Sequence, residues 1–138
     1  MSVPTIVIEK MDRQRLLSAA KDALTSLRPA PAASALLSEI ARARIVSKKF
    51  LPTNVVAMHR RVEIRDNITK SKKRLRLVYP DENATDIEAV SVVTPIGAAL
   101  IGLSEGDLID WCSASGDRHS IAIVRVWPGA TRILRRAT

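Results

Sequence analysis

Thr94-Pro-Ile-Gly-Ala-Ala-Leu-Ile-Gly-Leu-Ser-Glu-Gly-Asp107 is the most informative segment of this 138-residue chain for predicting its fold. Thr94 suits the N-cap of a helix, Pro95 suits the first helical position, where it sacrifices no hydrogen bond, and Gly102 suits the C-terminal cap. The residues between them are apolar on nearly every side. A helix with so little polar surface must be enclosed, so the segment predicts a short helix packed on a sheet.

Strands are expected on both sides of this helix, because apolar and polar residues alternate there with a period of two. The alternating segments are residues 62–65, 74–79 and 90–92 before the helix and residues 121–127 after it, and Gly106 and Asp107 turn the chain into a further strand at residues 108–112. Turn-forming residues at 80–86 and 113–117 separate these segments. The expected architecture is a small antiparallel sheet wrapped on the one helix.

Residues 11–49 predict an antiparallel helical hairpin. Two apolar stripes with spacings of three and four run along them: Leu17, Ala20, Leu24 and Leu27, then Ala33, Leu36, Ile40, Ala43 and Ser47. Pro29 and Pro31 separate the stripes, since proline inside a helix removes a hydrogen bond and clashes with the preceding turn. The chain is therefore predicted to be α+β, with a short coiled-coil hairpin in residues 1–50 and the sheet in residues 51–138.

The composition is that of a folded globular domain, with 46% hydrophobic and 26% charged residues. The 22 Lys and Arg residues exceed the 14 Asp and Glu residues, which gives a net charge of +8. Residues 11–49 carry a net charge of +5 and residues 50–138 a net charge of +3, so the hairpin is the more basic part. This excess predicts attraction to an acidic surface without choosing among nucleic acid, membrane and protein.

The location of the protein is predicted from its single cysteine and from its lack of targeting signals. One cysteine, Cys112, excludes an intramolecular disulfide and suits a reducing compartment. The apolar patch at residues 3–8 is too short for a signal peptide, and no run of about 20 apolar residues could span a membrane. We therefore expect a cytoplasmic protein without a membrane partner.

The segment from Thr94 to Asp107 resembles the signature of the bacterial transcript-cleavage factors GreA and GreB, whose C-terminal domain has an FKBP-like fold. The chain resembles more closely the shorter Rnk family, the regulators of nucleoside diphosphate kinase. That second resemblance covers Pro4–Ile8, Asn54–Met58, Leu77–Pro80 and the signature running into Trp111. Length and order agree from end to end.

The resemblance implies that the partner is bacterial RNA polymerase. In this group the globular domain docks on the rim of the polymerase secondary channel, and the hairpin points inward. By resemblance to the cleavage factors, the docking residues here are Thr94, Pro95 and Ile96. The alternative is that these three residues only cap the helix and pack the core.

The tip of the hairpin predicts the absence of transcript cleavage. In the cleavage factors, acidic residues at the tip help to hold a second magnesium ion, and Mg²⁺ needs hard oxygen ligands. The tip here is formed by Leu27, Arg28, Pro29, Ala30 and Pro31, and residues 25–35 contain no Asp or Glu. Asp22 and Glu39 lie further back along the helices. We therefore expect no enzymatic activity, no catalytic residue, no metal site, no cofactor and no small-molecule substrate.

Two other functions remain open from the sequence. The basic run of Lys70, Lys72, Lys73, Arg74 and Arg76 could follow phosphates in non-specific nucleic-acid binding, or lie along a solvated turn and outer strand face. With only 3% aromatic residues, a stacking platform for single-stranded nucleic acid is weakly supported. An FKBP-like prolyl isomerase is less favoured, because such pockets are lined by aromatic residues.

The remaining reactive side chains are expected to be structural. Cys112, His119 and Ser120 are close in sequence, but a cysteine nucleophile needs a base held beside it, so Cys112 is predicted to pack in the fold. His59, next to two arginines, is predicted to lie on the surface. The spacing of the two histidines and one cysteine matches no zinc site.

Overall fold

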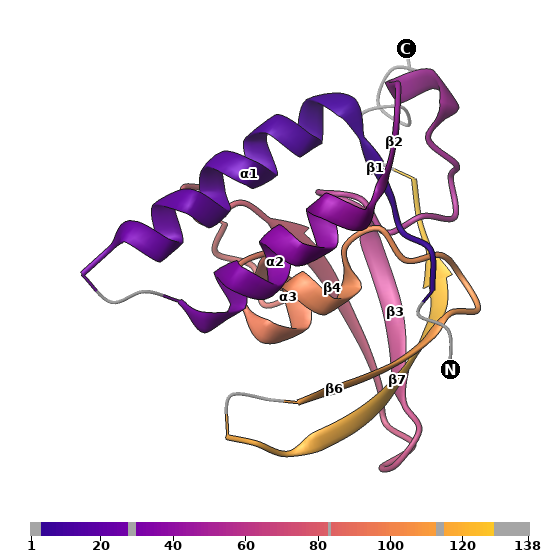
Figure 1. Cartoon of the computed structure of the whole chain (residues 1–138). Coiled ribbons are helices and arrows are strands. Elements are labelled where there is room, and N and C mark those ends of the chain that lie inside the picture. Colours follow the sequence, from indigo (N-terminus) through magenta and orange to yellow (C-terminus); the bar gives the residue numbers. More distant parts are fainter. Residues whose placement is uncertain (1–3, 28–29, 83, 113–114, 129–138) are drawn as a thin grey trace.

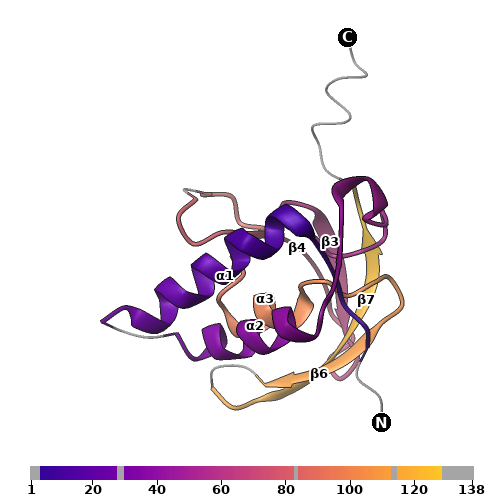
Figure 2. The same cartoon turned by 45° about the horizontal axis from the view of Figure 1, so that its top comes forward.

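The structure is a computed structural model that describes residues 4–27, 30–82, 84–112 and 115–128. Three helices, α1 (Lys10–Thr25), α2 (Pro31–Arg42) and α3 (Pro95–Leu100), lie on one face of a curved sheet (Figures 1 and 2). The strands of that sheet are β3 (Arg61–Asp66), β4 (Lys72–Val78), β5 (Ala89–Ser91), β6 (Leu108–Cys112) and β7 (Arg118–Val126). The predicted α+β fold with an N-terminal helical hairpin is confirmed.

The five strands are arranged in the order β5-β4-β3-β7-β6, and the sheet is mixed. The prediction of an antiparallel sheet holds for β3 with β4, β3 with β7 and β6 with β7, but β5 runs parallel to β4. The parallel pairing follows from the connection between β4 and β5. Residues 79–88 carry the chain back toward the start of β4, whereas an antiparallel neighbour would follow from a tight turn.

Alternation along the strands gives the sheet one buried face. Val62 and Ile64 of β3 are buried, as are Leu75 and Leu77 of β4 and Ile121 and Ile123 of β7. The residues between them point to the other face and are exposed or half-buried. The buried side chains form one continuous core with residues of all three helices.

Helix α3 begins and ends as its sequence predicts. The Thr94 hydroxyl oxygen accepts a hydrogen bond from the Gly97 N–H at 3.2 Å, and Pro95 takes the first helical position. Gly102 follows the helix with φ +84°, in the left-handed region that favours glycine. A Cβ atom on Gly102 would also lie 2.8 Å from the Ile6 Cβ, so this turn has no room for another side chain.

The second helix of the hairpin is shorter than predicted. It ends at Arg42, and the chain then forms strand β2 (Arg44–Val46) and a short 3-10 helix, η1 (Lys48–Phe50). Strand β2 pairs in parallel with β1 (Val7–Glu9), which leads directly into α1. The sequence analysis missed this two-stranded sheet, because three-residue strands are too short for a periodic pattern.

The apolar face of α1 also differs from the prediction. The fully buried residues are Leu16 and Ala20, while Leu17 is only half-buried. Leu24 is 37% exposed and Leu27 is completely exposed, because the neighbouring elements cover only the N-terminal part of α1. In α2 the predicted Ala33, Leu36 and Ile40 are buried as expected. No helix in the described ranges is both long and apolar enough to cross a membrane.

Candidate functional site

The three residues predicted to dock on a partner form the corner between β5 and α3. Pro95 is exposed, whereas Thr94 and Ile96 are half-buried. The Thr94 hydroxyl donates a hydrogen bond to the Ser91 carbonyl at 2.7 Å while it accepts the bond from the Gly97 N–H. The backbone N–H of Thr94 also bonds to the Ser91 carbonyl, at 3.2 Å. The Thr94 side chain is therefore fixed by capping, and Pro95 is the part of the corner that a partner can reach.

Gly97 makes this corner compact. A Cβ atom on Gly97 would collide with the Ser91 carbonyl oxygen and would lie 2.8 Å from the Val92 Cα. The first turn of α3 therefore packs directly on the backbone of the preceding segment. Such packing holds Pro95 at a fixed position relative to the sheet, which is what a docking surface on a rigid element requires.

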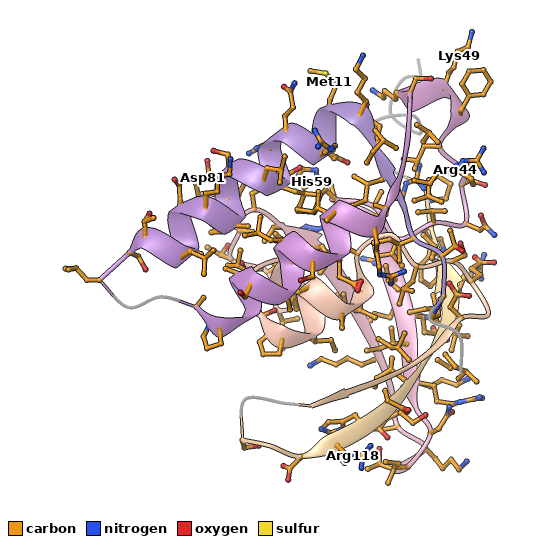
Figure 3. The ribbon with its side chains drawn as sticks, viewed as in Figure 1. Met11, Arg44, Lys49, His59, Asp81 and Arg118 are labelled. Carbon is orange, nitrogen blue, oxygen red and sulfur yellow. The ribbon has the colours of Figure 1, made fainter. Side chains whose placement is uncertain are left out.

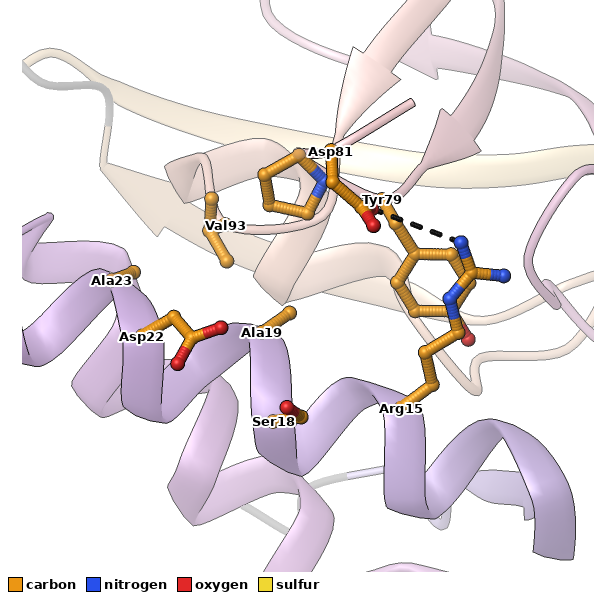
Figure 4. Close-up of a pocket in the computed structure, with 9 residues that line it drawn as sticks. Arg15, Ser18, Ala19, Asp22, Ala23, Tyr79, Asp81 and Val93 are labelled. Atoms are coloured by element: carbon orange, nitrogen blue, oxygen red, sulfur yellow. Dashed lines mark ion pairs between the residues drawn. The ribbon is translucent and has the colours of Figure 1, made fainter. Parts of the chain in front are cut away.

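A cavity of about 320 Å³ lies next to the corner, between α1 and the segment that follows β4 (Figure 4). Its lining comprises Arg15, Ser18, Ala19, Asp22, Ala23, Tyr79, Pro80, Asp81 and Val93. Val93 joins the two features, because it lines the cavity and directly precedes Thr94. The Arg15 guanidinium lies 3.9 Å from the centroid of the Tyr79 ring and 3.7 Å from an Asp81 carboxylate oxygen.

Polar groups under this cavity tie α1 to the sheet. The Tyr79 hydroxyl donates a hydrogen bond to Asp12 Oδ1 at 3.0 Å. Burial raises the pKa of the Asp12 carboxyl, although the hydrogen bond from Tyr79 partly offsets it. Burial and the nearby Asp12 charge also raise the pKa of the Tyr79 hydroxyl, so this group stays protonated and remains a donor.

Glu82 extends this cluster on the side away from Asp12. One carboxylate oxygen accepts the Tyr79 backbone N–H at 2.7 Å, and both lie 2.9 Å from His59 Nε2. Burial alone would raise the pKa of Glu82, but these hydrogen bonds outweigh it and the net pKa is lowered. His59 is 46% exposed at its side chain, which confirms that it lies on the surface. Sequence reasoning missed the cluster because Asp12 and Tyr79 are far apart in sequence.

The hairpin tip offers no carboxylate among its described residues. Leu27 and Pro31 are exposed, and the Ala30 N–H closes the turn by a 3.2 Å bond to the Ala23 carbonyl. Arg28 and Pro29 lie outside the described residues. Of the two carboxylates nearest the tip, Glu39 forms an ion pair with Arg42 at 2.8 Å, and Asp22 is exposed and lines the cavity.

The basic run lies on the turn after β3 and along β4, and this position leaves both alternatives open. Lys70 takes a positive φ of 64° in the turn, and Lys72, Lys73 and Arg74 are exposed. Arg74 lies 3.4 Å from Glu63, and Arg76 pairs with Asp86.

The residues weighed for catalysis lie on two adjacent strands, where Cys112 pairs with Arg118. In the β6–β7 pairing His119 lies opposite Trp111, and its Nδ1 is 2.8 Å from Asp66 Oδ2. This hydrogen bond lowers the pKa of Asp66. The side chain of Cys112 lies outside the described residues, so its predicted packing stays a prediction. Within the described ranges, no group of three or more His, Cys, Asp or Glu residues could hold a metal ion.

Comparisons with known proteins agree with this geometry. Residues 51–128 match the family "Transcription elongation factor, GreA/GreB, C-term". The "Regulator of nucleoside diphosphate kinase" of Escherichia coli (strain K12) is 40% identical over 113 residues, which are 80% of each chain. The "Transcription elongation factor GreA" of Bartonella tribocorum is 32% identical over 87 residues, which are 63% of this chain and 55% of that protein.

A solved structure extends the similarity to the fold. It is titled "Prokaryotic transcription elongation factor GreA/GreB from Nitrosomonas europaea" and superposes with a TM-score of 0.71 at 34% identity. The match covers 91% of this chain and 99% of that one, so it includes the hairpin as well as the sheet. The chain belongs to the GreA/GreB C-terminal-domain family and is a homologue of the Rnk regulators of nucleoside diphosphate kinase within it.

Proposed function

We propose that this protein is a cytoplasmic regulator of transcription that binds RNA polymerase at the rim of the secondary channel and does not stimulate transcript cleavage. The contact is made by the corner of Thr94, Pro95 and Ile96, and the hairpin points into the channel. We infer the absence of cleavage from the hairpin tip, because residues 25–35 contain no carboxylate.

The structure of the corner supports its role in docking. Pro95 is exposed although the first turn of its helix packs directly on the backbone of residues 91 and 92, and its ring presents an apolar edge to solvent. Capping requires only Thr94 and the backbone, so the helix does not depend on what the Pro95 ring touches. A rigid apolar edge of this kind loses little conformational entropy when it binds.

Charge supports the orientation of the hairpin. Residues 10–42, which span both helices of the hairpin, carry six Lys and Arg against three Asp and Glu, and this net charge of +3 favours the approach of the hairpin to an acidic channel. Binding should therefore weaken as the salt concentration rises.

The first experiment tests docking. Core RNA polymerase from the source organism is captured by the tagged full chain, by Pro95→Asp and by the control Pro52→Asp, which changes another exposed proline in the same way. We expect Pro95→Asp to lose most of the binding and to unfold cooperatively near the wild-type temperature, because a carboxylate is tolerated at a helix N-terminus. Full binding by a folded Pro95→Asp variant would remove the docking role of this corner.

The second experiment tests the mechanism on stalled transcription complexes. The protein alone should release no short 3′ RNA fragments, and an excess of it should suppress the cleavage that GreA stimulates. If it released fragments at the rate of a cleavage factor, the argument from the tip would be wrong. Unchanged GreA-stimulated cleavage at saturating polymerase binding would locate the protein elsewhere on the enzyme.

A further inference from the structure

The face of the sheet opposite the helices carries an unusual number of cations. The outward positions of β3, β4 and β7 alternate with positions that are buried under the helices, and they form this outer sheet face. Figure 3 shows that side chains also project from the side of these strands away from α1, α2 and α3. The six basic residues of the outer sheet face are Arg61, Arg65, Lys72, Arg74, Arg76 and Arg125. Neighbouring strands bring them together from three separate parts of the chain.

Cross-strand pairing on this face places like charges directly opposite each other. Arg61 pairs with Arg76, and Arg65 pairs with Lys72. Like charges in opposite positions destabilise a sheet. Arg61 and Arg76 are each compensated by a carboxylate, but Arg65 and Lys72 have no carboxylate partner among the described residues, so their juxtaposition favours a ligand that neutralises them.

Among the described residues, carboxylates pair with three of the six cations on the outer sheet face. Glu88 lies 3.0 Å from Arg61, Glu63 lies 3.4 Å from Arg74, and Asp86 pairs with Arg76. Arg65 donates a hydrogen bond to the neutral Asn67 side chain at 3.1 Å, and Lys72 is exposed. The face therefore keeps a net charge of +3 and attracts a polyanion.

Trp127 adds an aromatic ring in the middle of these cations. The guanidinium carbon of Arg125 lies 4.8 Å from the centroid of this ring, and that of Arg74 lies 5.5 Å from it. Trp127 is half-buried, and its backbone N–H is held by the Arg61 carbonyl at 2.9 Å. Indole rings and guanidinium planes are both surfaces on which an unpaired base stacks.

We propose that the outer sheet face binds single-stranded nucleic acid, with its phosphates on the cations and one base stacked on Arg74, Trp127 and Arg125. Alternate residues of a strand are about 6.6 Å apart, so Lys72, Arg74 and Arg76 form a regular row along β4 that an extended backbone can follow. A duplex keeps its bases paired and can use only the cations. This binding is separate from the proposed docking on polymerase, because Pro95 begins α3, and α3 lies on the helical side of the sheet (Figure 1).

The test measures fluorescence anisotropy of a labelled 12-nucleotide oligouridine with the full chain. Arg65→Glu combined with Lys72→Glu is compared with Arg13→Glu combined with Lys21→Glu, two exposed residues of α1 that change the net charge equally. We expect the first pair of changes to weaken binding at least tenfold and the second less than threefold. The logarithm of affinity should fall with the logarithm of salt concentration with a slope of about −2 to −3 for three to four phosphates.

Stacking is tested separately with Trp127→Leu, for which we expect at least a fivefold loss of affinity. If this variant does not fold, quenching of Trp127 fluorescence by oligouridine, measured in the Trp111→Phe background, replaces it. Three results would each overturn the proposal. The first is equal weakening of binding by the two charge-reversed pairs, and the second is tighter binding of a 12-base-pair duplex or of polyglutamate than of oligouridine. The third is that Trp127 shows neither a loss of affinity on substitution nor quenching by oligouridine.

Discussion

At the root of the helical hairpin Leu16 and Ala20 are fully buried, whereas at its open end Leu24 is 37% exposed and Leu27 is completely exposed. The root is also held by the hydrogen bond from Tyr79 to Asp12, while the described residues of the open end form local bonds such as that from the Ala30 N–H to the Ala23 carbonyl. Folding energy is therefore concentrated at the root. Ala32 and Ala33 of α2 are buried beside the tip, but Leu27 is not fixed by packing, so the absence of a carboxylate at this position bears on function.

The largest expected effect concerns the support of the root. The Val7 N–H bonds to the Gly102 carbonyl at 3.0 Å, so Gly102 holds the strand that leads into α1. Gly102→Val places a β-branched side chain at a positive φ and against Ile6, and it should cost about 3 kcal/mol or more. Thermal unfolding followed by circular dichroism measures this loss.

Gly106→Ala is the matched control for that change. Gly106 has φ +91°, but a Cβ atom there meets nothing within 4 Å. The control should therefore lose about 1 kcal/mol of stability, through backbone strain alone. Equal losses in the two variants would show that the contact between Gly102 and Ile6 contributes nothing.

Truncation of leucines along α1 measures how far the root extends. Leu16→Ala removes a fully buried side chain and should destabilise the protein by about 3 kcal/mol. Leu24→Ala, two turns further along, should cost less than about 1 kcal/mol, because that side chain keeps much of its exposure in the fold. Urea denaturation of both variants gives the two values, and similar losses would contradict the division into root and open end.

Tyr79→Phe tests the polar part of the root and should cost about 1 kcal/mol through the lost hydrogen bond to Asp12. The pKa of Asp12 is higher in the folded protein than in the unfolded chain. Its contribution to the free energy of unfolding is therefore fully present below the unfolded pKa and is lost as pH rises through the folded pKa. Without the Tyr79 hydroxyl the pKa of Asp12 should rise further. The stability difference from wild type should then be larger at pH 7 than at pH 4.

Measurement of unfolding free energies at the two pH values, together with carbon NMR titration of the Asp12 carboxyl, checks this expectation. The control is the same Tyr79→Phe comparison made in an Asp12→Asn background. Because that background lacks the titrating group, the stability difference caused by Tyr79→Phe should no longer depend on pH. A difference that stays constant from pH 4 to pH 7 would contradict the role of Asp12.

The structure is predicted best from the sequence where it depends on the conformational preference of single residues. Thr94, Pro95 and Gly102 mark the ends of α3 because capping, a fixed φ and a positive φ are properties of single positions. The structure is predicted worst where the contacting residues are far apart in the sequence. The parallel pairing of β5 with β4 and of β1 with β2 has no local signal, and neither does the contact between Tyr79 and Asp12.

The shifted face of α1 is an intermediate case. A stripe that begins at Leu17 and one that begins at Leu16 both have helical spacing, and only the position of the sheet and α2 chooses between them. The docking corner was placed by family resemblance, and local chemistry explains its shape. The outer sheet face was visible in the sequence only as the basic run on β4, since the arginines of β3 and β7 join it through the register of the sheet.

The smallest expected effect lies at the open end, where Leu27→Ala should change the free energy of unfolding by less than about 0.5 kcal/mol. Leu27 is as exposed in the fold as in an unfolded chain, so its truncation removes no buried apolar area. Replicate urea denaturation curves measured beside those of Leu24→Ala can resolve such a difference. A loss above about 1 kcal/mol would mean that Leu27 packs against the fold, and the open end would then be part of the stabilised hairpin.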